Sequence, residues 1–386
     1  MEALRFNGTG SEYFKIWIVN ILLTIITLGI YYPWAKVRNR RYFYANSTLG
    51  GRNFEYHATG KQLFVGFLIG IIFFALYTML GQVNPLMGGG LLLVFMLVLP
   101  WLIWRSLIFN MRVTSFSNVY FSFKGRLGRA YTIFLAYPIL FIIMLALFGV
   151  VASIIMPIIK TIDPTILLIV GFIVGFIGMF VYLYFFAFVK KNSTEYFINN
   201  SYYGQGAFQS NLETNKFFMI ILKTIGISFI PIVFIIVVAD LLGGMNSSMF
   251  SFNMSANAFV SGAEIFFIIS YFIMLFVMML IMAYMVTRER SYVYENIVLD
   301  DRITFESTLS ARDLAWVMAS NLFLIFLTLG LAFPWAKVRV ARLMLENTLV
   351  DTEIGFDNYI TQQERAVSAL GDQIGDAFDV DVGVAF

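Results

Sequence analysis

Residues 62–104 read QLFVGFLIGIIFFALYTMLGQVNPLMGGGLLLVFMLVLPWLIW and contain no charged side chain. A helix needs about 20 apolar residues to cross a hydrocarbon core about 30 Å thick, so this stretch is long enough for two crossings. Gln82–Pro85 and the glycines at 88–90 interrupt it near the middle. Because backbone polar groups in lipid must be bonded within the segment, both halves are predicted to be helices.

Apolar segments of similar length recur along the chain, at 16–35, 130–159, 164–189, 217–239, 265–287 and 314–336. The whole sequence is 60% hydrophobic and only 13% charged, whereas a soluble domain has about 25% charged residues. These features predict an all-α polytopic membrane protein with six to eight transmembrane helices, and they make the lipid bilayer its first partner.

Several function classes are disfavoured by composition. The chain has no cysteine and one histidine, His57, so thiolate chemistry and histidine-rich metal sites are excluded. No phosphate-binding loop or catalytic triad order is present. We therefore expect no enzyme activity, no metal and no cofactor. The basic residues flank apolar segments rather than forming a stripe, which argues against nucleic-acid binding.

Basic residues also indicate the orientation. The connections at 36–61, 105–129, 190–216 and 288–313 hold 18 of the 26 lysines and arginines. The positive-inside trend places these connections in the cytoplasm. Residues 351–386 carry eight acids and one base. We thus expect a multi-pass domain at 1–350 and an acidic cytoplasmic tail at 351–386, for which a docking segment and a disordered end are both open.

Two distant stretches are nearly identical. Thr27–Arg38 reads TLGIYYPWAKVR and Thr328–Arg339 reads TLGLAFPWAKVR. The same offset aligns Asn20 with Asn321 and Arg41 with Arg342, which indicates an internal repeat. A weaker Phe-led linker, often preceded by alternating polar and apolar residues, predicts short extended segments on the cytoplasmic face and five related units, at about 6–53, 54–120, 121–207, 208–304 and 305–350.

The number of membrane crossings decides whether the two copies of the motif end on the same face of the membrane. If all eight segments cross the membrane, the two Pro-Trp-Ala-Lys-Val-Arg motifs end on opposite faces, as in inverted repeats. Alternatively, segments 16–35 and 314–336 re-enter and return as basic helices, which places both motifs and both termini in the cytoplasm. Re-entry agrees better with the charges, although it places Lys36 and Lys337 deep, where they need water or protein beside them.

The twin motif is the leading candidate binding site. Its prolines are expected to end or kink a helix, its tryptophans to anchor at the membrane interface, and its bases to attract anionic lipid headgroups or a small anionic solute. The candidates are Pro33, Trp34, Lys36, Arg38, Arg41, Pro334, Trp335, Lys337, Arg339 and Arg342. Ordinary span-end anchoring by the same residues is the competing interpretation.

Three further polar residues are predicted inside apolar segments. Asn20 and Asn321 are expected to bond between helices. Lys223 interrupts segment 217–239 and lies too far from Lys216 to reach the headgroups easily, so it is a candidate functional residue.

The sequence also resembles a known family. The opening Gly8-Thr9-Gly10, the Pro-Trp-Ala motif, Arg41–Asn46 (RYFYAN) and Gly375–Gly383 (GDAFDVDVG) are similar to the YjgN-like family of bacterial inner-membrane proteins. This resemblance implies a multi-pass protein of the bacterial inner membrane and brings no catalytic residues with it. Two functions remain open: a transporter or channel for a small, anionic solute, and a non-conducting lipid-interacting scaffold or assembly factor. The sequence leaves the oligomeric state open.

Overall fold

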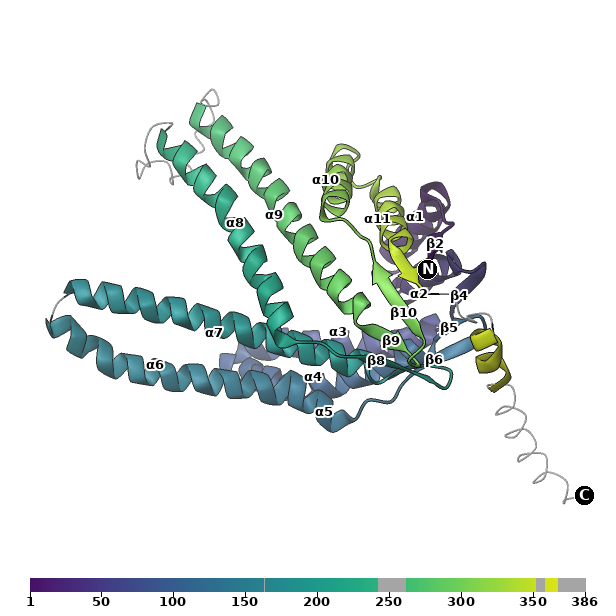
Figure 1. Cartoon of the computed structure of the whole chain (residues 1–386), viewed down its shortest axis with the longest axis horizontal. Helices are drawn as coiled ribbons and strands as arrows, with labels where there is room; N and C mark the ends of the chain where they lie inside the picture. Colours follow the sequence, from purple (N-terminus) through teal and green to yellow (C-terminus); the bar gives the residue numbers. More distant parts are fainter. Residues whose placement is uncertain (163, 242–261, 352–357, 367–386) are drawn as a thin grey trace, which may run out of the picture.

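The computed structural model describes residues 1–162, 164–241, 262–351 and 358–366. In this part of the chain, pairs of helices alternate with short strands (Figure 1). The pairs are α1 (Gly10–Ile26) with α2 (Tyr32–Ala45), α3 (Gly60–Val83) with α4 (Pro85–Arg112), the run α5 (Leu127–Tyr131), η1 (Thr132–Ala136) and α6 (Tyr137–Ile162) with α7 (Pro164–Ile198), α8 (Thr214–Leu241) with α9 (Gly262–Glu295), and α10 (Ala311–Leu327) with α11 (Phe333–Glu346).

The short strands form one antiparallel sheet in the order β1-β11-β10-β9-β8-β7-β6-β5-β4-β3-β2. They are β1 (Glu2–Ala3), β2 (Arg5–Phe6), β3 (Ser47–Leu49), β4 (Arg52–Tyr56), β5 (Thr114–Phe116), β6 (Val119–Phe123), β7 (Ser201–Tyr203), β8 (Gly206–Ser210), β9 (Ile297–Leu299), β10 (Ile303–Ser307) and β11 (Thr348–Val350). Each helix pair leaves the sheet from one strand and returns to that strand's hydrogen-bonded neighbour.

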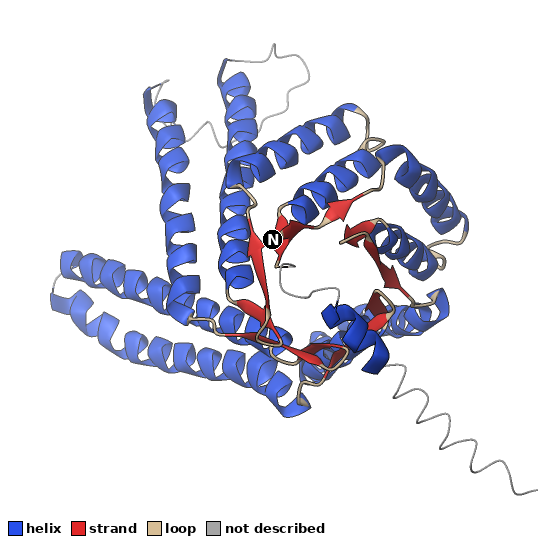
Figure 2. Ribbon diagram, turned by 45° about the vertical axis from the view of Figure 1, so that its right-hand side comes forward, coloured by secondary structure: helices blue, strands red, loops and turns tan. Residues whose placement is uncertain are grey.

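The sheet closes on itself near the N-terminus. β1 pairs with β11 and β2 pairs with β3, and only Leu4 lies between β1 and β2. The Leu4 amide donates to the Thr348 carbonyl over 3.0 Å, so residues 2–6 join the two ends of the sheet. Figure 2 shows the resulting ring of strands with helices radiating from it. Closure satisfies the backbone groups that an open edge would expose.

The all-α prediction is therefore incomplete. The Phe-led linkers were expected to be extended, but the sequence did not show that they pair with one another. Tight turns make the pairing possible: both central residues have positive φ at Gly50-Gly51, Ser117-Asn118 and Asp300-Asp301. Such turns match the twist of antiparallel strands and favour glycine, asparagine and aspartate.

Five helices in the described ranges are long and apolar enough to cross a membrane, namely those at 60–83, 85–112, 127–158, 165–198 and 270–295. They account for five of the six predicted central segments. The sixth, 217–239, lies in α8, which packs beside α7 and α9.

The terminal segments fold as short helical hairpins rather than as single crossings. α1 has 17 residues and α2 has 14, which corresponds to about 25 Å and 21 Å of helix. Both ends of this hairpin reach neighbouring strands, and α10 with α11 does the same. Each terminal hairpin therefore returns to the sheet that it leaves, which is the geometry that the re-entrant alternative requires. The choice between re-entry and crossing stays a prediction.

The repeated Thr-Leu-Gly sequence builds the tip of each terminal hairpin. Leu28 and Gly29 have positive φ, as do Leu329 and Gly330. The Thr27 hydroxyl accepts from the Tyr31 amide over 3.0 Å, and Thr328 does the same for Ala332 over 2.9 Å. Glycine adopts a positive φ without steric cost. Gly29 and Gly330 therefore help the chain to reverse within a few residues.

The interior of the ring is a hydrophobic core. Most strands contribute one buried side chain each to this core, including Phe116, Val119, Tyr203 and Leu299. Residues 358–366 form a short helix whose Tyr359 and Ile360 belong to the same core. In Figure 1 this helix lies on the side of the sheet away from α6 and α7. The remainder of the predicted acidic tail, 352–357 and 367–386, lies outside the described residues.

We expect this core to control stability. Phe116 is 4% exposed and its ring centroid lies 4.6 Å from that of Phe54. Phe116→Ala should lower the free energy of unfolding by about 3–5 kcal/mol, because it removes buried area and leaves a cavity. Denaturant titration in mixed micelles measures this change. Tyr120→Ala, at a position that is 46% exposed, is the control, and equal losses in both variants would contradict a packed ring interior.

Candidate functional site

The mid-segment asparagines hold the terminal hairpins together. The Asn20 amide donates to Asn39 Oδ1 over 3.0 Å, and Asn20 Oδ1 accepts from Arg38 over 3.4 Å. In the other hairpin, Asn321 donates to the Ala336 carbonyl over 3.1 Å and accepts from Arg339 over 2.8 Å. Arg38 and Arg339 are therefore engaged within their own hairpins.

The prolines have a different role from the one predicted. Pro33 and Pro334 lie in the first turn of α2 and α11 and are almost completely buried. The first amides of a helix have no acceptor within it, so a missing N–H costs nothing there. They begin helices instead of ending them.

Arg41 and Arg342 join neighbouring helix pairs. Arg41 donates to the Ala58 carbonyl over 2.8 Å, just before α3 begins. Arg342 donates to the Gly8 carbonyl over 3.1 Å, just before α1 begins. The two contacts occupy corresponding places around the ring, because α11 precedes α1 across the closure of the sheet.

The tryptophans pack against the same helix starts. Trp34 covers Gly60 and packs at a tilt against Phe64, whereas Trp335 covers Gly10 and packs at a tilt against Phe14. At each glycine, the indole ring occupies the place that a Cβ would take. These residues are therefore docking contacts between helix pairs, and anchoring at the membrane interface stays a prediction. The sequence signal that could have indicated these contacts is the Thr-Gly pair at the start of α1 and of α3.

The two motif lysines line one cavity, although 301 positions separate them in the sequence. The cavity lies among α1, α2 and α11 and has a volume of about 740 Å³. Its walls are Tyr13, Trp17, Asn20, Ile21, Thr24, Ile25, Tyr32, Ala35, Lys36, Asn39, Arg40, Phe43, Tyr44, Phe333 and Lys337. Of the ten motif residues, only Lys36 and Lys337 reach it. Sequence reasoning missed Arg40, because its counterpart in the second copy is not an arginine.

The cations of this cavity have neutral partners. Lys337 donates to the Tyr13 hydroxyl over 3.2 Å and lies 4.8 Å from the Phe43 ring centroid. Arg40 donates to the Tyr56 hydroxyl over 2.9 Å and to Asn110 over 2.7 Å. No carboxylate is among the residues that line the cavity.

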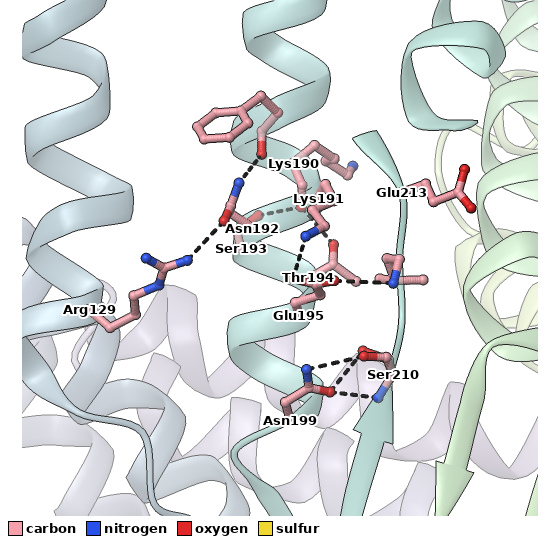
Figure 3. A network of polar contacts seen from close by, with 12 residues as sticks. Arg129, Lys190, Lys191, Asn192, Ser193, Thr194, Glu195, Asn199, Ser210 and Glu213 are labelled. Carbon is pink, nitrogen blue, oxygen red and sulfur yellow. Dashed lines mark hydrogen bonds and ion pairs between the residues drawn. The ribbon is translucent and has the colours of Figure 1, made fainter. Parts of the chain in front are cut away.

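The base of α7 shows the contrasting arrangement (Figure 3). There, Lys191 pairs with Glu195 over 2.7 Å. Lys190 pairs with Glu289 of α9 over 3.0 Å. Arg129 donates to Asn192 over 3.0 Å in the same network. Because the lysines at this place are neutralised by acids, we interpret the network as a structural connection between helix pairs.

Two apolar cavities follow the axis of the ring. The first, of about 540 Å³, has one lining residue, Tyr44, in common with the lysine cavity. The second, of about 230 Å³, shares Tyr294 and four phenylalanines with the first and is bounded by Tyr359 of the tail helix. The shared phenylalanines are Phe54, Phe121, Phe208 and Phe305. The sequence marked them as linker residues but did not show that they meet on one axis.

The tail helix is fitted to the β7–β8 hairpin. The Tyr359 hydroxyl lies where a Cβ of residue 206 would be, and Gly206 provides the space. Gln363 accepts from the Gln205 amide over 2.8 Å, and Glu364 accepts from Ser117 over 2.6 Å. Burial raises the pKa of Tyr359 to about 12, so its phenol is neutral at physiological pH.

Lys223 is not part of this arrangement. It lies on an exposed face of α8, and the described residues place no hydrogen-bonding or acidic partner beside it. A functional role for Lys223 stays a prediction.

Fold and site together define a polytopic membrane protein in which helix pairs surround a closed β ring. The chain belongs to the family described as "Bacterial protein of unknown function (DUF898)", whose model matches residues 1–377. It is 29% identical over 368 residues to inner membrane protein YjgN of Salmonella typhimurium, covering 92% of this chain and 89% of that protein. It is 28% identical over 381 residues to YjgN of Escherichia coli K12, covering 94% and 92%.

No solved structure matches the chain. The family resemblance expected from the sequence is confirmed, and the protein is a multi-pass protein of the bacterial inner membrane.

The tryptophan–glycine contact predicts a sharp difference between two glycines of α3. Gly60→Ala places a methyl group against the Trp34 ring and should cost about 1–3 kcal/mol through overpacking. Gly66→Ala meets nothing within 4 Å and should be neutral or stabilising by up to about 1 kcal/mol. Thermal unfolding in detergent measures both, and an equal effect of the two variants would contradict tight docking of Trp34.

Proposed function

We propose that the protein is a non-catalytic transporter for an anionic solute, built from five related units around the axis of the ring. The observation that carries this proposal is the shared cavity, in which Lys36 and Lys337 from the two copies of the motif face the same space. The basic connections lie at the sheet, so the positive-inside trend orients the ring toward the cytoplasm.

The neighbouring cavities supply a route. From the lysine cavity, the route passes Tyr44 into the axial cavity, then the four shared phenylalanines, and ends at Tyr359. Aromatic constrictions can close a pathway by excluding water. Under this proposal, the four phenylalanines and the tail helix are two barriers that close the route.

One observation favours the alternative, a non-conducting scaffold that interacts with lipid. The interlocking tryptophan and arginine contacts tie neighbouring helix pairs together, and a scaffold needs such rigidity. The transporter proposal has the stronger support, because rigidity alone requires neither a cavity between the two motif copies nor cations without acids beside them.

Charge reversal at the lysines tests the proposal. Lys36→Glu with Lys337→Glu should reduce flux at least about tenfold, which corresponds to about 1.4 kcal/mol of lost interaction with the anion. The assay follows inorganic phosphate, glycerol phosphate and hexyl phosphate in proteoliposomes. Lys61→Glu is the matched control, because Lys61 is exposed at the start of α3 and outside the cavity.

Two results would contradict the proposal. One is flux that survives in the double variant, provided that this variant is as monodisperse in detergent as the parent. The other is the absence of movement of all three probe anions, both in the parent protein and in the protein without its tail helix.

The tail helix predicts a second effect on flux. Ending the chain at residue 357 removes Tyr359, Ile360 and Glu364 from the ring and should increase flux severalfold, because one barrier is lost. Ending the chain at residue 366 retains these contacts and should leave flux unchanged. The same proteoliposome assay compares the two truncations. Equal flux from both would show that the tail helix does not close the route.

A further inference from the structure

The lysine cavity changes in polarity along its length. At the hairpin tips its walls are Ile25, Tyr32 and Phe333, whose side chains are exposed. Lys36 lies four residues after Tyr32, and Lys337 lies four residues after Phe333, which is about 6 Å toward the sheet in each helix. The cavity is therefore apolar at the tips and cationic nearer the ring.

The charge at the cationic end is not balanced by the protein. Lys36 and Arg40 are one helical turn apart and repel each other. Arg40 and Lys337 donate to hydroxyl and amide groups, as described above. Lys36 and Lys337 are exposed and Arg40 is partly buried, and a cation that faces the hydrocarbon of a bilayer is costly unless an anion or strong acceptors face it. An anionic group bound among these three side chains would remove that cost.

The remaining walls do not suit a small hydrated ion. Trp17, Ile21, Ile25 and Phe333 present aromatic and aliphatic surface along the cavity, and the Trp17 and Phe333 rings lie 6.2 Å apart. The axial cavities beyond Tyr44 contain no charged lining residue. A bare anion would leave this surface wet, whereas an apolar chain would cover it.

We propose that the cavity binds an anionic amphiphile, namely an acidic phospholipid of the ring-side leaflet. Its phosphate lies among Lys36, Arg40 and Lys337, and an acyl chain runs along Ile21 and Ile25 toward the tips. This is the orientation of a leaflet lipid when the ring faces the headgroups. The inference rests on the proposed function, because it names the substrate class of that same cavity.

The test measures lipid bound to the full-length protein by native mass spectrometry. The protein is purified from vesicles containing equal amounts of phosphatidylglycerol and phosphatidylcholine. We expect phosphatidylglycerol to be enriched on the parent protein and reduced about tenfold on Lys36→Gln with Lys337→Gln. Lys15→Gln with Lys61→Gln removes two exposed lysines outside the cavity and should retain the lipid.

A second pair of variants tests the acyl chain. Ile25 lines the cavity, whereas the adjacent Ile26 does not, and both are exposed, at 66% and 75%. Ile25→Asp should lose phosphatidylglycerol severalfold, whereas Ile26→Asp should retain it. Because both substitutions are at the same hairpin tip, a general effect on folding would affect them alike, and equal binding by the two would overturn the inference.

Competition with a soluble headgroup separates this inference from the proposed function. Glycerol phosphate at millimolar concentration should displace little of the lipid. If glycerol phosphate binds as tightly as phosphatidylglycerol, the inference that the ligand is an amphiphile is wrong, but the anion-binding site is supported. Retention of phosphatidylglycerol by the Lys36→Gln with Lys337→Gln variant would also overturn the inference. If neither ligand binds the parent protein, the anion site itself fails, and the proposed function fails with it.

Discussion

The backbone hydrogen bonds that residues 2–6 make to two partners determine the arrangement of the whole molecule. β1 bonds to β11 at one end of the sheet and β2 bonds to β3 at the other. An open sheet of such short strands would expose unpaired amides and carbonyls at both edges. By closing the ring, a few residues bring the first and last helix pairs into contact.

This closure explains why the repeated motif serves two purposes. Within each copy, the tryptophan and the aligned arginine, Arg41 or Arg342, contact the start of the next helix pair around the ring. The contact from α11 to α1 exists only because the sheet closes. The same closure brings Lys337 beside Tyr13 and into the cavity that Lys36 lines. The gathering of cations at the site is thus a consequence of the topology.

Aromatic side chains line and narrow the interior of the ring, whereas the interior of a wider barrel would hold water. Phe54, Phe121, Phe208 and Phe305 come from four different strands and converge between the two axial cavities. The tail helix then occupies the far side of the core.

Much of the architecture could be predicted from residues alone. Long uncharged stretches such as 62–104 determine transmembrane helices, because lipid requires every backbone group to be bonded locally. The Thr-Leu-Gly and proline positions of the repeat indicate short hairpins, and the charges favour re-entry over eight crossings. These features depend on neighbours in the sequence, and a single chain contains all the information that they need.

The closed sheet and the cavity were decided by tertiary structure. A strand of two or three residues has no sequence signal of its own, and its partner can lie anywhere in the chain, so the pairing of β1 with β11 was not predictable. The same holds for Arg40, for the convergence of the phenylalanines and for the partners of Trp34 and Trp335. Sequence identified the lysines as candidates because they recur in the motif. Only the long-range pairing of strands determined that they share one space, since charges 301 residues apart can meet only when the fold brings them together.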